Sequence, residues 1–242
     1  MRIACWSGPR NLSTAMMYAF GQRADCAVID EPFYAAYLAR TGLDHPMRDA
    51  VLASQSQDAD VVGRMLAGSP PDGRAHWYQK HMTQHLLPDF PRDWMAGARH
   101  VFLIRHPARV VASFEKGYAA LTLSDIGFVQ QAEIFDYVTK SGENPVVIDS
   151  FDIRNDPEGM LSRLCAAIGI SFDPAMLSWP RGGMAADGVW APHWYASVHG
   201  STGFAGPEGP LPALTGRLAE LVDAAMPAYA KMAERKISPE AG

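Results

Sequence analysis

Short apolar segments alternate along the chain with longer stretches of helical periodicity, and this alternation constrains the fold more than any other feature. The apolar segments have the length and composition of buried strands. They lie at residues 3–6, 27–29, 101–104 and 146–148, with residues 76–80 as a further candidate. Helical patterns follow them, and Pro107 and Pro157 stand where a first helical residue is expected. This order predicts an α/β fold with a central parallel sheet flanked by helices.

The length, charge and cysteine content of the chain limit the kinds of protein it can be. With 242 residues, 48% of them apolar, it can bury one large core, so we expect a single domain over residues 1–242. Its 21 basic and 26 acidic residues lack the positive excess of proteins that bind nucleic acids. Cys5, Cys26 and Cys165 are odd in number and lie in apolar segments, which indicates buried free thiols.

Membrane and export signals are not apparent in the sequence. No apolar segment approaches the roughly 20 residues that a membrane-spanning helix requires. The turn at Gly8 and Pro9 comes too early to leave room for the apolar part of a signal peptide. We therefore expect a soluble cytoplasmic protein with neither a membrane nor a nucleic-acid partner. Because two-fold dimers are the commonest oligomers, a homodimer is the default expectation if the chain associates.

The loop between the first strand and the first helix predicts an anion site. It comprises Ser7, Gly8, Pro9, Arg10, Asn11, Leu12, Ser13 and Thr14. A loop of this kind directs several backbone N–H groups and the positive end of a helix dipole to one place. Arg10 adds a planar cation, and Ser13 and Thr14 can donate to a ligand. The same residues could also form a plain turn with a hydroxyl helix cap, and the Gly-Lys-Ser/Thr ending of nucleotide kinases is absent.

Two later segments also carry arginine where an anion would bind. Arg105 follows the apolar strand at residues 101–104, and Ser113 lies on the helix that Pro107 begins. An arginine at the carboxyl end of a strand beside a helix N-terminus forms an anion site where open α/β sheets usually bind ligands. The second segment reads Arg181-Gly182-Gly183 and is followed by Trp190.

Taken in this order, the three segments resemble the donor-binding elements of the sulfotransferases that use 3'-phosphoadenosine-5'-phosphosulfate (PAPS). By this resemblance, residues 9–14 form the 5'-phosphosulfate loop, with Leu12 where many members have glycine. Arg105 and Ser113 bind the 3'-phosphate, and Arg181, Gly182, Gly183 and Trp190 complete that site. Residues 146–172 also resemble the family's strand, acidic turn and helix. The resemblance implies a P-loop-like three-layer fold that transfers a sulfo group from PAPS to a hydroxyl or amine of a small molecule, without a metal.

The sequence leaves two candidates for the base that accepts the proton of the acceptor. His81 falls on the catalytic histidine of the cytosolic branch if Leu86-Leu87-Pro88 is matched to that branch's Leu-Leu-Pro. Glu31 is the other candidate, because several bacterial and carbohydrate-directed members use an early glutamate, and Asp30 beside it would raise its pKa. Asp30-Glu31-Pro32 could equally be a helix-capping cluster.

Two cations complete the catalytic prediction. Arg10 is expected to stabilise the charge of the leaving group. Lys80 could steady a sulfonate oxygen, or it could be an exposed structural lysine. His81 and His85 stand four residues apart, but the segment between them lacks the glutamate of the metalloprotease motif, so we expect no metal.

Three other readings stay open. Arg105-His106 after a strand resembles histidine phosphatases, although Pro107 stands where they have glycine. A nucleotide kinase would explain the anion loop, and a non-catalytic nucleotide-binding module would explain the departures from the sulfotransferase motifs. The acceptor pocket is expected from residues 42–73, with helical pieces at 47–55 and 60–66, and from residues 184–204. A final helix is expected at about residues 213–234.

Overall fold

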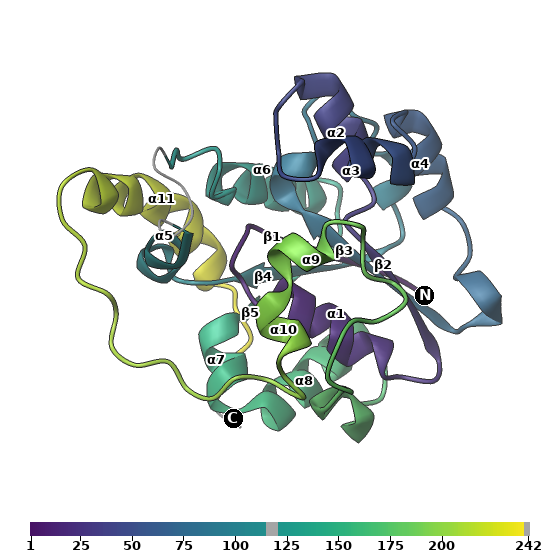
Figure 1. Ribbon diagram of the computed structural model, residues 1–242. Coiled ribbons are helices and arrows are strands. Elements are labelled where there is room, and N and C mark those ends of the chain that lie inside the picture. The colour runs from purple at the N-terminus through teal and green to yellow at the C-terminus, as the bar shows by residue number, and fades with distance from the viewer. Residues whose placement is uncertain (115–120, 240–242) are drawn as a thin grey trace.

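A five-stranded sheet forms the centre of the molecule. The computed structural model describes residues 1–114 and 121–239 (Figure 1). The strands are β1 (Arg2–Ser7), β2 (Cys26–Asp30), β3 (His76–Met82), β4 (Arg99–Ile104) and β5 (Val146–Asp149). Their order is β2-β3-β1-β4-β5, and every pairing is parallel. The predicted parallel sheet is confirmed, and β3 continues two residues beyond the expected end, through His81 and Met82.

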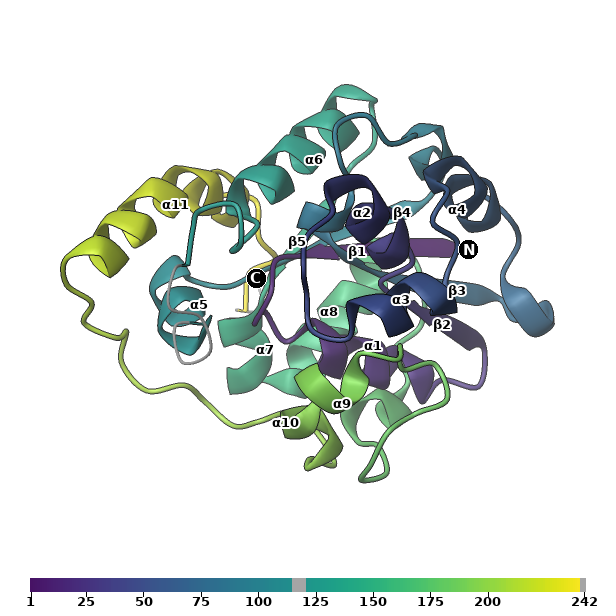
Figure 2. The same cartoon turned by 45° about the horizontal axis from the view of Figure 1, so that its top comes forward.

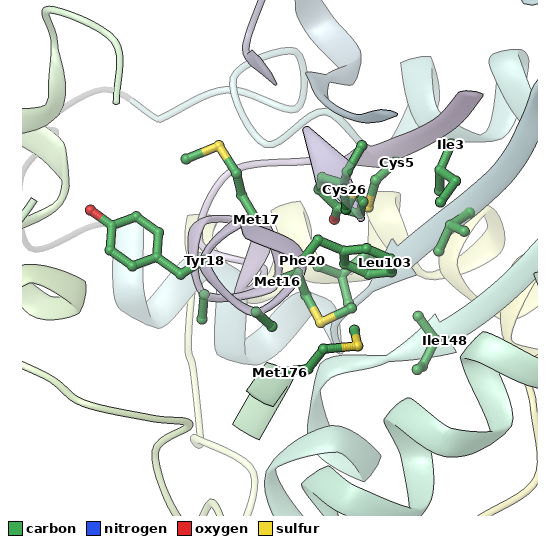
Figure 3. Close-up of a cluster of buried hydrophobic side chains, with 14 of the residues drawn as sticks. Ile3, Cys5, Met16, Met17, Tyr18, Phe20, Cys26, Leu103, Ile148 and Met176 are labelled. Atoms are coloured by element: carbon green, nitrogen blue, oxygen red, sulfur yellow. The ribbon is translucent and has the colours of Figure 1, made fainter. Parts of the chain in front are cut away.

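Helices cover both faces of this sheet. On one face lie α1 (Ser13–Gly21) and α8 (Pro157–Ile168), and on the other lie α6 (Phe128–Lys140) and α11 (Arg217–Ala233), as Figures 1 and 2 show. Both faces of the sheet carry apolar side chains that must be buried. In β1, Ile3 and Cys5 face α1 while Trp6 faces α6, and all three side chains are buried. In Figure 3, Met16 and Phe20 of α1 belong to the core of the first face. The predicted three-layer α/β fold is confirmed.

Shorter helices surround these layers. They are α2 (Tyr34–Thr41), α3 (Arg48–Ser54), α4 (Ala59–Leu66), α5 (Pro107–Phe114), α7 (Ser150–Asn155), α9 (Ala191–Trp194) and α10 (Ala196–His199). Single 3-10 turns are η1 (Pro71–Gly73), η2 (Thr83–His85), η3 (Asp93–Met95) and η5 (Pro174–Leu177). Pro107 and Pro157 begin α5 and α8 as predicted. The last helix begins at Arg217 and not near residue 213, because Gly216 before it has a φ of 56° and a ψ of −141°, a conformation that interrupts a helix.

Buried side-chain amides hold the carboxyl ends of β1 and β4 together. Asn11 Nδ2 and Gln131 Nε2 both donate to the carbonyl oxygen of Leu103, at 3.1 and 2.9 Å. Gln131 Nε2 also lies 2.9 Å from the carbonyl oxygen of Trp6. Backbone carbonyls buried at strand ends need such partners. The loop after β1 is thereby fixed beside the end of β4, where Arg105 follows.

The three cysteines are free and buried, as predicted. Within the two described ranges, no helix combines the length and the apolar character that crossing a membrane would require. The same ranges contain no cluster of three histidine, cysteine, aspartate or glutamate side chains that could hold a metal ion. His81 and His85 do not share a helical face, because His81 lies on β3 and His85 lies in the turn η2.

The buried imidazole of His81 predicts acid-sensitive stability. Burial, with smaller effects from His100 and Lys80, lowers the pKa of His81 to about 3. In the unfolded chain its pKa is near the ordinary value of about 6.5, so between these values only the unfolded state binds the proton. The free energy of unfolding should therefore fall as the pH falls from about 6.5 to 3, by an amount on the order of several kcal/mol for this group.

Urea titrations at a series of pH values measure this effect. His81→Leu should flatten the curve of unfolding free energy against pH in that window, whatever its effect on stability at neutral pH. Part of the pH dependence of unfolding should remain in the variant, because burial also lowers the pKa values of His85 and His100. An unchanged dependence of the unfolding free energy on pH in the variant would contradict the assignment of His81 as a buried neutral imidazole.

Candidate active site

A cavity of about 420 Å³ opens at the carboxyl ends of the strands. Because all five strands are parallel, the segments that follow β1, β2, β3, β4 and β5 meet at this edge of the sheet. The cavity is lined by residues from each of these segments and from the α9–α10 region. Those used below are Arg10, Leu12, Ser13, Thr14, Ala15, Glu31, Tyr34, Tyr37, His45, Lys80, His85, Arg105, Ser113, Arg154, Trp194 and Tyr195.

The N-terminus of α1 faces the cavity without a side-chain cap. The first helical hydrogen bond runs from Met16 N to the carbonyl oxygen of Leu12, at 3.1 Å. The N–H groups of Ser13, Thr14 and Ala15 therefore have no helical partner, and all three residues line the cavity. Together with the helix dipole, these groups provide fixed donors and a partial positive charge where the sequence predicts an anion site.

Backbone strain is concentrated at this cavity. The structure describes five residues other than glycine with positive φ, and three of them, Arg10 (61°), Leu12 (71°) and Glu31 (41°), line the cavity. A left-handed conformation costs an L-residue on the order of 1 kcal/mol, and such strain is found preferentially at functional sites. Leu12 thus adopts a left-handed conformation that usually favours glycine.

Arg10 of the loop after β1 lies beside Arg105 and Ser113, which belong to the segment after β4. Arg10 Nε donates to Ser113 Oγ at 3.2 Å, which links the loop after β1 to α5. Arg105 donates from one guanidinium nitrogen to the carbonyl oxygen of Arg10 at 2.6 Å, and it forms an ion pair with Glu208 through the other. The two guanidinium groups and the hydroxyl therefore surround one part of the cavity.

Lys80 lies at the opposite part of the cavity in a buried polar cluster. Its side chain is 1% exposed, so the alternative of an exposed structural lysine is wrong. Its ammonium group contacts Asp30 Oδ1 at 2.7 Å, Glu31 Oε1, and the hydroxyl of Tyr195 at 2.8 Å. The Tyr195 hydroxyl also accepts from Trp190 Nε1 at 3.0 Å and donates to Asp30 Oδ2 at 2.7 Å.

This cluster shifts the acid–base properties of its members. Burial raises the pKa of Glu31, and Asp30 adds to this effect while Lys80 opposes it, so that the pKa lies above the ordinary value. Burial alone would lower the pKa of Lys80, but the charges of Asp30 and Glu31 outweigh it and raise the pKa. Lys80 is therefore held as an ammonium ion, and Glu31 is a carboxylate that can take up a proton.

The two candidate bases occupy different environments. Glu31 lines the cavity, and its Oε2 lies 3.6 Å from Nδ1 of His85. His81 is 2% exposed, stacks on Trp6 with ring centroids 4.4 Å apart, and is not among the lining residues. Neighbouring residues of a strand point to opposite faces, so Lys80 can reach the cavity while His81 enters the core. The structure thus brings Glu31, and not His81, to the site.

The late arginine segment lies apart from the cavity lining. Arg181 is exposed, Gly182 N donates to the carbonyl oxygen of His199 at 2.9 Å, and Gly183 lies near Asp187 and His199. Trp190 is 1% exposed and supports the Lys80 cluster through Tyr195. A role of these residues in binding the 3'-phosphate stays a prediction.

Several residues of the cavity were not recognised from the sequence as site residues. Arg154, on α7, faces the same cavity as Arg105, and Tyr195 closes the Lys80 cluster from a segment more than 100 residues away in sequence. His85 was considered only as a metal ligand, yet its ring stacks on Tyr34 and borders Glu31. The position of Arg154, shortly after a short apolar strand, could have indicated a site residue. No sequence motif marks Tyr195.

Comparison with known proteins identifies the class. The family model described as "Sulfotransferase domain" matches residues 1–236, and the chain therefore belongs to the sulfotransferase domain family. Two proteins of Arabidopsis thaliana, named branched-chain-amino-acid aminotransferase-like proteins 1 and 2, are 41% and 38% identical over 207 residues. These residues are 85% of this chain but 37% and 36% of the plant proteins, so the chain spans little more than a third of their length.

Solved structures share the fold. The sulfotransferase domain of the curacin biosynthetic pathway superposes with a TM-score of 0.55 at 17% identity, and covers 98% of each chain. The sulfotransferase domain of the olefin synthase of Synechococcus PCC 7002 superposes with a TM-score of 0.50 at 16% identity, and covers 93% of this chain and 94% of that one. The central parallel sheet with helices on both faces is thus the architecture of sulfotransferase domains.

Gly8 provides a test of the loop's packing. A Cβ atom at this position would lie 2.6 Å from the carbonyl oxygen of Ile126, which closes over the loop. Gly8→Ala should therefore force the two backbones apart and lower the free energy of unfolding by about 1–3 kcal/mol in urea titrations. Gly206→Ala is the matched control, because a Cβ there meets no atom within 4 Å. Equal stability of the two variants would show that the loop does not depend on this contact.

Proposed function

We propose that the protein transfers the sulfo group of PAPS to a hydroxyl or amine of a small molecule. The observation that carries the proposal is the arrangement of one cavity, in which Arg10, Arg105 and Ser113 surround one part and Glu31 and Lys80 lie at another. The first part suits a nucleotide with two anionic groups, and the second suits an acceptor that must lose a proton.

The residues present fit the donor. Uncapped N–H groups at the start of α1 suit the 5'-phosphosulfate, since fixed backbone donors and a helix dipole stabilise anionic oxygens. Arg105 and Ser113 would hold the 3'-phosphate, as the family resemblance implies. Arg10 lies between the two groups, because its side chain reaches Ser113 while its backbone belongs to the loop.

The reaction requires one bond to form and one to break at sulfur. The acceptor oxygen or nitrogen attacks the sulfur, and the bond between sulfur and the 5'-phosphate oxygen breaks. The proton of the acceptor passes to Glu31, and the leaving product is 3'-phosphoadenosine-5'-phosphate. Arg10 and the N-terminus of α1 would stabilise the charge on the leaving phosphate, and Lys80 would orient the Glu31 carboxylate.

Glu31 is favoured over His81 as the base on position. A base must lie within hydrogen-bonding reach of the proton that it accepts, and Glu31 lines the cavity while His81 lies in the core. Burial also raises the pKa of Glu31 toward neutral pH, and a general base is most effective when its pKa is near the working pH. Neutral His85, whose pKa burial holds well below its ordinary value, could accept a hydrogen bond beside it.

Aromatic side chains suggest how the acceptor binds. Tyr34, Tyr37 and Trp194 line the cavity, and the rings of Tyr34 and Tyr37 stack on His85. The two segments expected to shape the acceptor pocket each contribute, through His45 from the first and Trp194 and Tyr195 from the second. Such a surface favours an acceptor with a flat or apolar body and a small polar group directed at Glu31.

The names of the plant relatives suggest a second chemistry, but the site does not favour it. Aminotransferases need a lysine that attacks a carbonyl as a neutral amine. Lys80 is the lysine of the cavity, and two carboxylates hold it as an ammonium ion with a raised pKa. Sulfuryl transfer uses this charged state directly, whereas Schiff-base formation would have to overcome it.

Ligand-dependent melting tests the donor site. We expect 3'-phosphoadenosine-5'-phosphate to raise the melting temperature more than AMP or Mg-ATP does at equal concentration, since only the bisphosphate carries both anionic groups. A ligand at about 100 times its dissociation constant stabilises the fold by roughly 2.7 kcal/mol, which scanning fluorimetry resolves. An equal shift with all three nucleotides would remove the 3'-phosphate site from the proposal.

Two substitutions test the base. Glu31→Gln should lower kcat by about 10²–10⁴-fold with little change in the KM for PAPS, because the amide cannot accept the proton. His81→Leu should keep kcat within about tenfold of the unsubstituted protein. Transfer is measured with labelled PAPS and the best acceptor from a panel of phenols, alcohols and amines. The reverse pattern would return the role to His81, and the melting shift with the bisphosphate serves as the control for folding.

A further inference from the structure

A carboxylate of the chain itself lies among three arginines beside the cavity. The side chain of Glu208 is 5% exposed. Its Oε1 lies 2.7 Å from a terminal nitrogen of Arg154 and also contacts Arg105, and its Oε2 lies 3.2 Å from Nε of Arg109. Arg105 follows β4, Arg109 lies in α5 and Arg154 lies in α7. The carboxylate therefore joins cations that follow two neighbouring strands.

Glu208 belongs to the long segment that connects α10 to α11. Residues 204–215, named here the strap, form neither helix nor strand, and most of these residues are exposed. Figures 1 and 2 show this yellow-green segment running past α7 and α5 on its way to α11. The carbonyl oxygens of Gly206 and Gly209 accept hydrogen bonds from Arg154 at 2.8 Å and from Arg109 at 2.6 Å. The same arginines thus bind the strap through its backbone and through Glu208.

The charges of this cluster do not balance. Three guanidinium ions surround one carboxylate, so the cluster keeps a positive surplus. A phosphate monoester carries up to about two negative charges and three acceptor oxygens, and it matches several arginines better than a single carboxylate does. Arg105 and Arg154 line the same cavity as Ser113; Arg10 joins Ser113 to Arg105, and Glu208 joins Arg105 to Arg154.

We propose that Glu208 occupies the place of the donor's 3'-phosphate and is displaced when the donor binds, with Arg109 and Arg154 joining Arg105 as ligands of that phosphate. This inference rests on the proposed donor site. Glu208 and the phosphate cannot share the three arginines, because both anions need the same N–H donors and repel each other at short distance. Donor binding then releases the strap from Arg109 and Arg154, and the apparent affinity for the donor is lowered by the fraction of molecules in which Glu208 is bound.

Glu208→Gln is the direct test, since it keeps the shape of the side chain and removes its charge. Dissociation constants of 3'-phosphoadenosine-5'-phosphate and of AMP are measured by isothermal titration calorimetry. In the variant, the bisphosphate should bind about tenfold more tightly, a change of roughly 1.4 kcal/mol, while AMP binds as before because it lacks the 3'-phosphate. Glu234→Gln is the matched control, because it makes the same charge change at an exposed position directly after the last helix.

Arg154→Gln tests the same site from the cationic side. This variant should bind the bisphosphate at least tenfold more weakly and bind AMP as before. Arg163→Gln on α8 should change the affinity for neither nucleotide. Melting temperatures with and without the bisphosphate accompany each variant, because Glu208→Gln leaves three arginines without a counterion and is expected to lower the melting temperature of the free protein. The increase in melting temperature on adding the bisphosphate should then be larger in Glu208→Gln than in the unsubstituted protein.

The outcomes separate this inference from the proposed function. If the bisphosphate is preferred over AMP by the same factor with and without Glu208→Gln, the role of Glu208 is wrong while the donor site stands. If neither nucleotide binds to the unsubstituted protein or to the variant, the proposed function fails, and this inference fails with it. Binding that appears only in the variant would support both.

Discussion

An ammonium ion buried near the end of β3 organises one part of the cavity. Lys80 is removed from water, and a buried charge is tolerated only when it is paired and hydrogen-bonded. Asp30 and Glu31 supply the opposite charges from the end of β2, and Tyr195 supplies a hydroxyl from the α9–α10 region. This one requirement therefore explains why the end of β2 turns toward β3, why Glu31 adopts a positive φ, and why a distant segment packs over the site.

The other half of the cavity has the opposite electrostatic character. Arg10, Arg105 and Arg154 come from the segments after β1, β4 and β5, and the open N-terminus of α1 adds its dipole. The cavity thus has a cationic part, and beside it lies a buried cluster in which two carboxylates contact one ammonium ion. Glu208 partly neutralises the cationic part, which links the position of the strap to the charge state of the site.

Much of the fold was predictable because its signals are local. Buried parallel strands appear as short apolar segments, and Pro107 and Pro157 mark helix starts whatever the rest of the chain does. The last helix was placed about one turn too early, because the periodicity of its residues continues through Gly216 while the backbone geometry of that glycine does not. The loop at residues 8–14 was recognised for the same local reason, since a strand, a turn and a helix start lie within one short segment.

The sequence by itself predicted the α/β class and the position of the loop after the first strand, and the family resemblance assigned Arg10, Arg105 and Ser113 to one donor. Only the tertiary structure placed Glu31 at the cavity and His81 in the core, because Glu31 follows the end of β2 at the carboxyl edge of the sheet, whereas alternation along β3 sends Lys80 to the cavity and His81 into the core. It also brought Tyr195 to Lys80 and Glu208 to the three arginines. Contacts between residues so far apart in sequence depend on how the layers pack, and no local pattern encodes them.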